Sequence, residues 1–398
     1  MTISSSSPAS SAQIESAQTH QIASARQVSD NENSIDEITS LSPETTGTRA
    51  EQERELRARL RRTRRHDQLR SASVTAALTL GLLALFYADL AFGHEVYSFS
   101  DITSVIAGIF DGETIPGLSF AIGELRMPRV IIGALCGIAF GMAGASFQHL
   151  LRNMMASPDI IGITTGANTA AVFGIVVLGL SDIRLSAFAL LGGLATATLV
   201  IWLSWDHGPN ISKLILMGIG LAAALNALTS WILIRADQWD MQTAQRWLTG
   251  SLSDAAWSQV MPITAIVVVS GLLLIALNRH ADMLRFGSSM ATGLGVRVAP
   301  TQIAVLLLAV ILLSAATATS GPIAFVSFLA GPIAFRLCGP NKPAIGRAGL
   351  VGACLVLASD IVAQHLPQAH VPVGVVTSLI GGPILVILMI RMACTKEV

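Results

Sequence analysis

The sequence predicts an all-α polytopic membrane protein with about ten transmembrane helices, one of them short and broken. Of its 398 residues, 52% are hydrophobic and only 13% are charged, and the mean hydropathy is +0.62. A soluble domain usually has about 25% charged residues, so this chain has too few polar side chains to cover a surface in water. Its charges are also clustered and leave long apolar runs between them, which is typical of membrane spans.

The amino-terminal part has a different composition from the rest. Residues 1–53 are rich in Ser, Thr and Gln, and such a segment cannot bury enough apolar surface to become ordered, so we expect a disordered tail. Residues 54–70 carry a dense run of arginines, which favours a basic cytoplasmic segment next to the membrane. Nucleic-acid binding by this run is conceivable, but the net charge of the chain is zero and we expect no nucleic-acid partner. Residues 71–398 are the predicted transmembrane domain.

Ten apolar segments are candidate spans. The eighth is too short to cross a bilayer alone and is typical of a broken helix buried among others. Gly321-Pro322 and Gly331-Pro332 enclose it and are expected to supply the breaks. The candidates are 72–92, 127–148, 160–180, 186–204, 212–235, 259–277, 301–320, 324–335, 347–364 and 374–393.

The distribution of charge between the spans predicts their orientation. With the amino terminus inside, the loops on the cytoplasmic side carry more Lys and Arg than those outside, so both termini are expected in the cytoplasm. The polar interruption at residues 279–300 then faces the cytoplasm. Its length and glycines predict two short helices joined by a turn, in contact with a partner outside the membrane.

Small residues at four-residue spacing predict close helix packing. The second span contains Gly133, Gly137, Gly141 and Gly144, and the fifth contains Gly218 and Gly220.

Several kinds of chemistry have no motif in this sequence. It contains no GxxxxGK[ST] phosphate loop and no metal-ligand spacing. Its four cysteines lie in or beside apolar segments, so we expect them to be small buried apolar side chains. Asp89 and Asp360 lie within predicted spans, and neither has an evident cationic partner at the same depth. A permease that a separate ATPase drives therefore explains the sequence best, and an ion-coupled secondary carrier is the alternative. For a carrier, Asp360→Asn should abolish uptake, whereas a permease should mostly tolerate it.

Five blocks of sequence resemble one family of transporters. They are LRMPRVIIGALCGIAFGMAGASFQHLLRNMMASPDIIG from Leu125, RWLTGSL from Arg246, the loop at 279–300, SGPIAFV from Ser320, and PVGVVT from Pro372 with GGP at 381–383. Together they resemble the FecCD-type ABC transporter permeases, which import ferric siderophores, haem and vitamin B12, over residues 75–392.

The resemblance implies a type II ABC importer permease in the cytoplasmic (cell inner) membrane, with no catalytic site or metal of its own. ATP and Mg²⁺ are expected on partner ATPase subunits, and the cargo is expected from an extracytoplasmic siderophore-binding protein. A ferric siderophore is the expected cargo, with haem or vitamin B12 as the alternatives. The chain is expected to pair with a second permease subunit inside the lipid bilayer.

The resemblance also assigns residues to three roles. Arg126 and Arg129 are expected to dock the binding protein, the alternative being that they anchor a helix end. Gln364 stands where the family often has a third docking arginine, which favours a pair of two different permease chains. A translocation gate is expected at Asn153, Met155 and Ser212. The ATPase-coupling contacts are expected at Leu284, Gly287, Ser288, Ser289, Met290, Gly293, Leu294 and Gly295.

Overall fold

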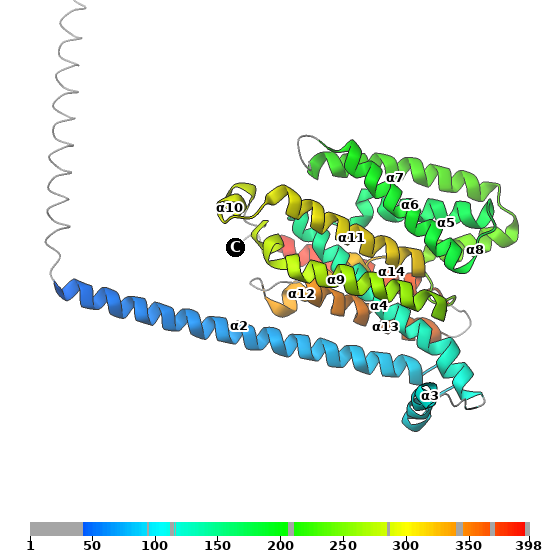
Figure 1. The fold of residues 1–398 in the computed structure, drawn as a ribbon, viewed down its shortest axis with the longest axis horizontal. Coiled ribbons are helices and arrows are strands. Elements are labelled where there is room, and N and C mark those ends of the chain that lie inside the picture. Colours follow the sequence, from blue (N-terminus) through cyan, green and yellow to red (C-terminus); the bar gives the residue numbers. More distant parts are fainter. Residues whose placement is uncertain are drawn as a thin grey trace, which may run out of the picture. The chain divides into compact units, whose positions relative to one another are not determined.

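The computed structural model describes residues 43–93, 95–111, 115, 117–205, 211–284, 287–339, 345–366 and 371–394. These residues are almost entirely helical, as the sequence predicts (Figure 1). η1 is a short π-helix that continues into α4, and η2 is a single 3-10 turn. The elements are α2 (Pro43–Ala91), α3 (Phe99–Asp111), η1 (Ser119–Arg126), α4 (Met127–Leu150), η2 (Pro158–Ile161), α5 (Ile163–Val176), α6 (Asp182–Leu203), α7 (Ile211–Ile234), α8 (Gln238–Thr249), α9 (Trp257–Leu284), α10 (Ser288–Gly293), α11 (Val298–Ser320), α12 (Val326–Cys338), α13 (Ile345–His365) and α14 (Val373–Cys394).

The chain divides into two units, residues 1–68 and residues 69–398. Residues 1–42 of the predicted tail lie outside the described residues. The described part of the first unit is the beginning of α2, which already includes residues 43–53. Glu53 and Glu55 each precede an arginine by four residues, a spacing that favours helix.

The ten predicted spans all correspond to apolar helices in the second unit. Seven of the described helices are long and apolar enough to cross a membrane, and three shorter apolar helices accompany them. The shorter ones are Ile163–Val176, Val326–Cys338 and Val373–Ile387. The predicted fold class, including a short eighth helix, is therefore confirmed.

The short helix α12 ends later than the sequence suggests. The break at Gly321 is present, with a φ of 70°, but α12 continues through Gly331-Pro332 to Cys338. Pro332 has no N–H to donate to the carbonyl oxygen of Phe328, four residues earlier. Gln148 of α4 replaces that donor, because its Nε2 donates to the Phe328 oxygen at 2.9 Å. A Cβ at Gly331 would overlap the Gln148 amide, so Gly331-Pro332 interlocks α12 with α4 instead of ending the helix.

Glycines have different surroundings in α4 and in α7. α4 packs against α9, α11, α12 and α13, and a Cβ at Gly137 would overlap the backbone of Ala353. The predicted packing role of this α4 glycine is therefore confirmed.

In α7, a Cβ at Gly220 would meet no atom within 4 Å, and Ile219 and Trp231 are exposed. One face of α7 thus has no partner among the described residues.

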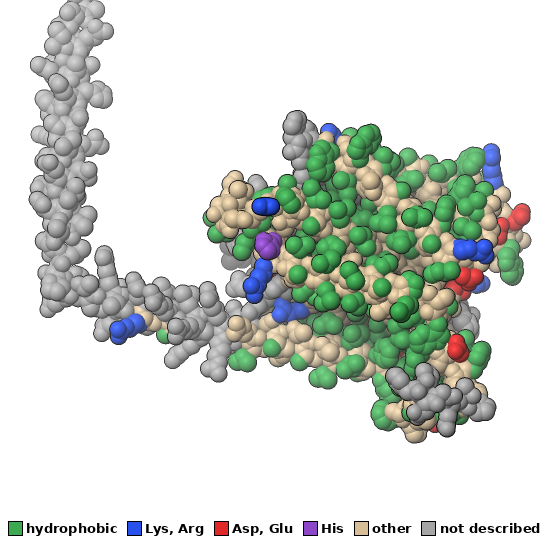
Figure 2. Space-filling model, in the orientation of Figure 1, with side chains coloured by type: hydrophobic (Ala, Val, Ile, Leu, Met, Phe, Trp, Pro, Cys, Tyr) green, Lys and Arg blue, Asp and Glu red, His purple; other side chains and the backbone are tan. Residues whose placement is uncertain are grey.

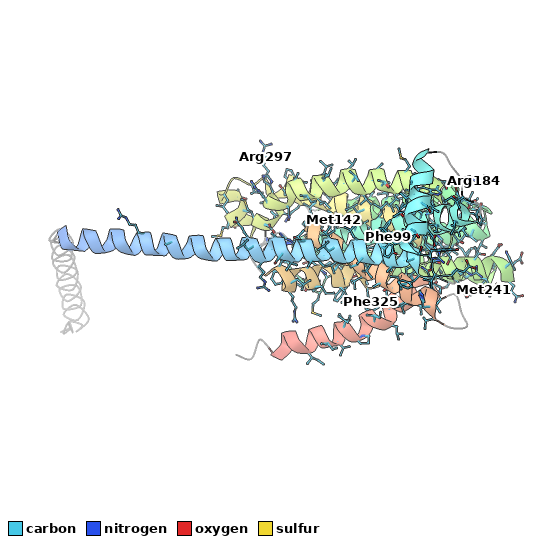
Figure 3. The ribbon with its side chains drawn as sticks, turned by 90° about the horizontal axis from the view of Figure 1, so that it is seen from below. Phe99, Met142, Arg184, Met241, Arg297 and Phe325 are labelled. Carbon is cyan, nitrogen blue, oxygen red and sulfur yellow. The ribbon has the colours of Figure 1, made fainter. Side chains whose placement is uncertain are left out.

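Charged side chains gather at the two ends of the second unit (Figure 2). On the face that Figure 2 shows, Lys, Arg and His side chains lie at the end that carries α10, and the Asp and Glu side chains in view lie at the opposite end, beside some arginines. Figure 3 places Arg297 at the first end, and Arg184 and Met241 at the second. Apolar side chains cover much of the face between these ends, as expected of a surface in contact with lipid.

Candidate functional site

Between α9 and α11, the described residues of the loop at 279–300 form one short helix, where the sequence predicted two. α9 continues to Leu284 because Asn278, Ala281 and Leu284 remain buried on one face of it. α10 then occupies Ser288–Gly293 between two glycines in the left-handed region, Gly287 (φ 104°) and Gly295 (φ 83°). Such angles favour glycine, so these two residues fix the turns on either side of α10. Gly293 is helical and does not form a turn.

α10 has a buried and an exposed side. Ala291 packs with Val296 and Leu284 in a small cluster of their own. On the other side, 60% of Met290 and 59% of Leu294 are exposed, and Ser289 and Gly293 are exposed beside them. The side chain of Ser288 lies outside the described residues. Met290 and Leu294 thus form a small exposed apolar surface, which suits the groove of a protein partner. Contact with an ATPase through this surface stays a prediction.

The predicted gate residues lie on two neighbouring segments. Asn153 and Met155 are in the turn after α4, where Asn153 Oδ1 accepts a hydrogen bond from the Met155 N–H at 2.9 Å. Ser212 is exposed in the first turn of α7. The connection after the turn packs on α7, since a Cβ at Gly162 would lie 3.1 Å from the carbonyl oxygen of Gly218. The structure therefore places the segment that follows the gate turn against α7, while a gate formed by Asn153, Met155 and Ser212 stays a prediction.

One contact joins the α10 loop to the gate turn. His149, in the last turn of α4, places Nε2 3.6 Å from Oδ1 of Asp282, near the end of α9. Its Nδ1 lies 2.7 Å from the carbonyl oxygen of Ala145. The helix that leads into α10 and the helix that leads into the gate turn are thus in contact through these two side chains.

At the opposite end, Arg126 holds the end of α2. Its guanidinium donates to the carbonyl oxygens of Leu90 at 2.8 Å and Glu95 at 2.9 Å, and it lies 4.6 Å from the ring centre of Tyr97. The last carbonyl groups of a helix have no partner within the helix. These bonds fit the alternative expectation, that Arg126 anchors a helix end. Docking by Arg126 stays a prediction.

Arg129 forms a two-pronged ion pair with Asp360 of α13. Its Nε and NH2 groups donate to the two carboxylate oxygens at 2.8 and 2.7 Å, and the Asp360 side chain is 0% exposed. Gln364 donates from Nε2 to Asp360 at 2.9 Å and to Asp89 of α2 at 2.7 Å. The expectation that Asp360 lacks a cationic partner is therefore wrong. Because Asp360→Asn would break this pair in a permease and in a carrier alike, that substitution does not distinguish them.

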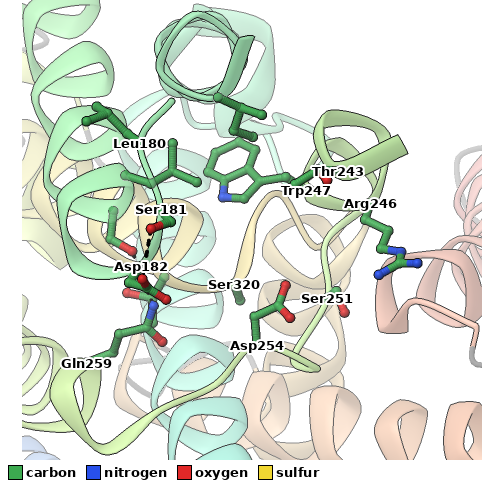
Figure 4. A pocket seen from close by; sticks show the side chains of 14 residues that line it. Leu180, Ser181, Asp182, Thr243, Arg246, Trp247, Ser251, Asp254, Gln259 and Ser320 are labelled. Carbon is green, nitrogen blue, oxygen red and sulfur yellow. Dashed lines mark hydrogen bonds between the residues drawn. The ribbon is translucent and has the colours of Figure 1, made fainter. Parts of the chain in front are cut away.

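A cavity of about 350 Å³ lies at the same end, and no sequence pattern predicted it (Figure 4). Its walls come from the α5–α6 turn, α8, the loop after α8, and the ends of α9 and α11. These segments are far apart in the sequence, and only the RWLTGSL block pointed to part of them. The lining residues are Ile175, Leu180, Ser181, Asp182, Leu185, Ser186, Thr243, Arg246, Trp247, Ser251, Asp254, Gln259, Thr319 and Ser320.

Comparisons with known proteins agree on one family. A model of the FecCD transport family matches residues 81–391. The ferric enterobactin transport system permease FepG of Escherichia coli (strain K12) is 36% identical over 290 residues, 73% of this chain and 88% of FepG. FepD, a permease of the same system, is 33% identical over 327 residues, 81% of this chain and 97% of FepD. A solved metal-chelate type ABC transporter in an inward-facing conformation matches with a TM-score of 0.72 and 26% identity, over 80% of this chain and 99% of that one.

Proposed function

Since the chain belongs to the FecCD transport family, we propose that it is the permease subunit of an ATP-driven importer of a ferric siderophore. The names of its relatives support an iron chelate as the cargo, because FepG and FepD are both permeases for ferric enterobactin. Haem and vitamin B12 are the alternative cargoes for the same type of permease.

The observation that carries this proposal is the exposed side of α10. Met290 and Leu294 are large apolar side chains in a loop outside the predicted spans, and each is more than half exposed. An apolar contact on a turn fixed by Gly287 and Gly295 can transmit a push from a partner into α9 and α11. The sequence has no phosphate loop, so ATP and Mg²⁺ belong on partner ATPase subunits that bind α10.

A second permease subunit would cover the face of α7 that has no partner among the described residues. Glycine and alanine on that face allow close helix approach. Because FepG and FepD are two different permeases of one system, a pair of unlike chains is the form that we propose.

The orientation completes the proposal. The end of the molecule that carries α10 is richer in Lys and Arg, which favours the cytoplasmic side of the membrane. Both termini are then cytoplasmic, and the end that carries Asp254 faces outward, toward an extracytoplasmic siderophore-binding protein. Docking there by Arg126, Arg129 and Gln364 would need these side chains to exchange their present partners.

Reconstituted uptake tests the proposal. The chain is placed in proteoliposomes with a partner permease, ATPase and binding protein, and uptake of ⁵⁵Fe-siderophore is measured with ATP on the cytoplasmic side. Uptake should require the ATPase, stop with vanadate and persist with a protonophore. Uptake that continues without the ATPase and collapses with the protonophore would instead show an ion-coupled carrier.

A further inference from the structure

The contact between His149 and Asp282 lies where the α10 loop meets the turn after α4. Nε2 of His149 is 3.6 Å from Oδ1 of Asp282, and the two side chains are 6% and 29% exposed. The pair is therefore largely removed from water, which weakens an attraction between charges less there than on an open surface. A charge contact in such a place can hold two helix ends in a fixed position.

Asp282 is joined to α10 by a packed cluster. It lies in the last turn of α9, two residues before Leu284. Leu284 packs with Ala291 of α10 and with Val296, which follows α10, and all three side chains are buried. Close-packed side chains transmit a displacement to their neighbours. A push on the exposed side of α10 therefore reaches the end of α9, where Asp282 lies.

His149 is joined to the turn after α4 through the backbone. Its carbonyl oxygen accepts a hydrogen bond from the Arg152 N–H at 3.2 Å, and the oxygen of Gln148 accepts one from the Asn153 N–H at 3.1 Å. Arg152 has a φ of 49°, a value that non-glycine residues adopt only where the surrounding structure determines it. The turn that contains Asn153 and Met155 is therefore fixed to the helix end that carries His149.

The surroundings of the His149 ring make this contact depend on charge. Nδ1 lies 2.7 Å from the carbonyl oxygen of Ala145, and because that oxygen can only accept, Nδ1 carries a proton. A neutral ring then has a lone pair at Nε2, which repels the Asp282 carboxylate. A ring with both protons is a cation and attracts the carboxylate. The contact thus holds the ends of α4 and α9 together through opposite charges.

Further along, α4 and α9 meet through apolar side chains. A Cβ at Gly271 would lie 3.4 Å from the sulfur of Met142, and Leu274 is fully buried in the main core cluster. Apolar contacts have no preferred direction, and methionine adapts to irregular gaps, so helices that pack in this way can shift along each other. The charge contact, by contrast, ties one point of α4 to one point of α9.

We propose that His149 and Asp282 are positioning residues that transmit the movement of α10 to the turn after α4. This inference rests on the proposed function, in which an ATPase binds α10 and drives transport. When the ATPase moves α10, the cluster around Leu284 displaces the end of α9, and the charge contact moves the end of α4 with it. The predicted gate then moves in step with ATP hydrolysis.

A double-mutant cycle in proteoliposomes tests this role. The chain is reconstituted with a partner permease, ATPase and binding protein, and ⁵⁵Fe-siderophore uptake and ATP hydrolysis are measured in the same vesicles. His149→Leu and Asp282→Leu should each lower the uptake per ATP hydrolysed by about fivefold or more, the lower end of the usual coupling between two sites. The double variant should lose no more than either single variant, because the effects of residues in contact do not add.

Three further variants separate this role from a purely structural one. Asp282→Glu keeps the charge and should couple nearly as well as the unchanged chain. Asp282→Ala is measured beside Asp282→Leu, so that a variant without the charge is available even if leucine prevents assembly. His280→Leu is the matched control, because His280 is an exposed histidine of α9 two residues from Asp282, and it should leave the uptake per ATP unchanged. A purely structural role would lower the yield of assembled complex but not the uptake per ATP of the complex that remains.

Losses that add in the double variant would overturn the inference, as would normal coupling without the Asp282 charge in a complex that elutes intact. The unchanged chain reports on the proposed function separately. If its uptake needs no ATPase, the proposed function is wrong. If its uptake needs the ATPase and the variants couple normally, only the role of this contact is wrong.

Discussion

The ion pair between Arg129 and Asp360 joins a largely buried arginine to a fully buried carboxylate, so its removal should destabilise the chain. Asp360 is fully buried, and its two carboxylate oxygens accept hydrogen bonds from Nε and NH2 of the guanidinium. Breaking such a pair on one side costs about 3–5 kcal/mol. Arg129→Met should therefore lower the Tm of the purified chain in detergent by several degrees. The double variant Arg129→Met/Asp360→Leu removes both charges and should recover most of the loss, as followed by thermal unfolding.

Arg235→Met is the control, because Arg235 is an exposed arginine that lies 4.1 Å from the ring centre of Trp231. Its loss should change the Tm little. If Arg129→Met kept the Tm but weakened capture of the binding protein, the docking role predicted from the resemblance would be right.

The sequence could place both charges in helices, but it could not pair them, because 231 residues separate Arg129 from Asp360 and only packing of α4 on α13 joins them.

At the scale of elements, the surroundings of Gly293 in α10 allow a direct test of the predicted coupling role. Gly293 is helical, and a Cβ there would meet no atom within 4 Å, so the subunit can accept a larger side chain. Gly293→Arg should leave the chain folded in the membrane. It should lower the uptake per ATP hydrolysed by tenfold or more, because the arginine lies beside Met290 and Leu294 on the proposed contact side. The measurement is ATPase rate and ⁵⁵Fe uptake in the same proteoliposomes.

Gly293→Ala is the matched variant and should transport normally, since alanine favours a helix and adds only a methyl group. Normal coupling by the arginine variant would mean that α10 is merely a connector. The sequence indicated that glycines shape the turns of this loop, which is right for Gly287 and Gly295, but it predicted two helices where the described residues form one. The error arises because residues 278–284 are polar in composition, yet their buried positions continue the packed face of α9.

At the scale of the whole molecule, hydropathy was sufficient to locate all ten apolar helices, because each must satisfy its backbone inside a membrane. It could not find α3 or α8, which are short and lie outside the predicted spans. Nor could it find the cavity, whose wall combines Asp182, Trp247, Gln259 and Ser320 from four separate segments. Such sites depend on how helices meet, and a hydropathy pattern contains no information about their neighbours.

Orientation is the property of the whole molecule on which the proposed partners depend. Ser289 and Asp254 are both exposed, on the α10 loop and on the rim of the cavity respectively. We predict that an impermeant maleimide added to intact spheroplasts labels Asp254→Cys but not Ser289→Cys, and that both react after the membrane is permeabilised. The background would carry Ser at Cys338, Cys354 and Cys394, while Cys136 is fully buried and can remain. The reverse labelling pattern would place α10 outside the cell, where no ATPase could bind it, and the excess of Lys and Arg at that end would then have failed as a guide to orientation.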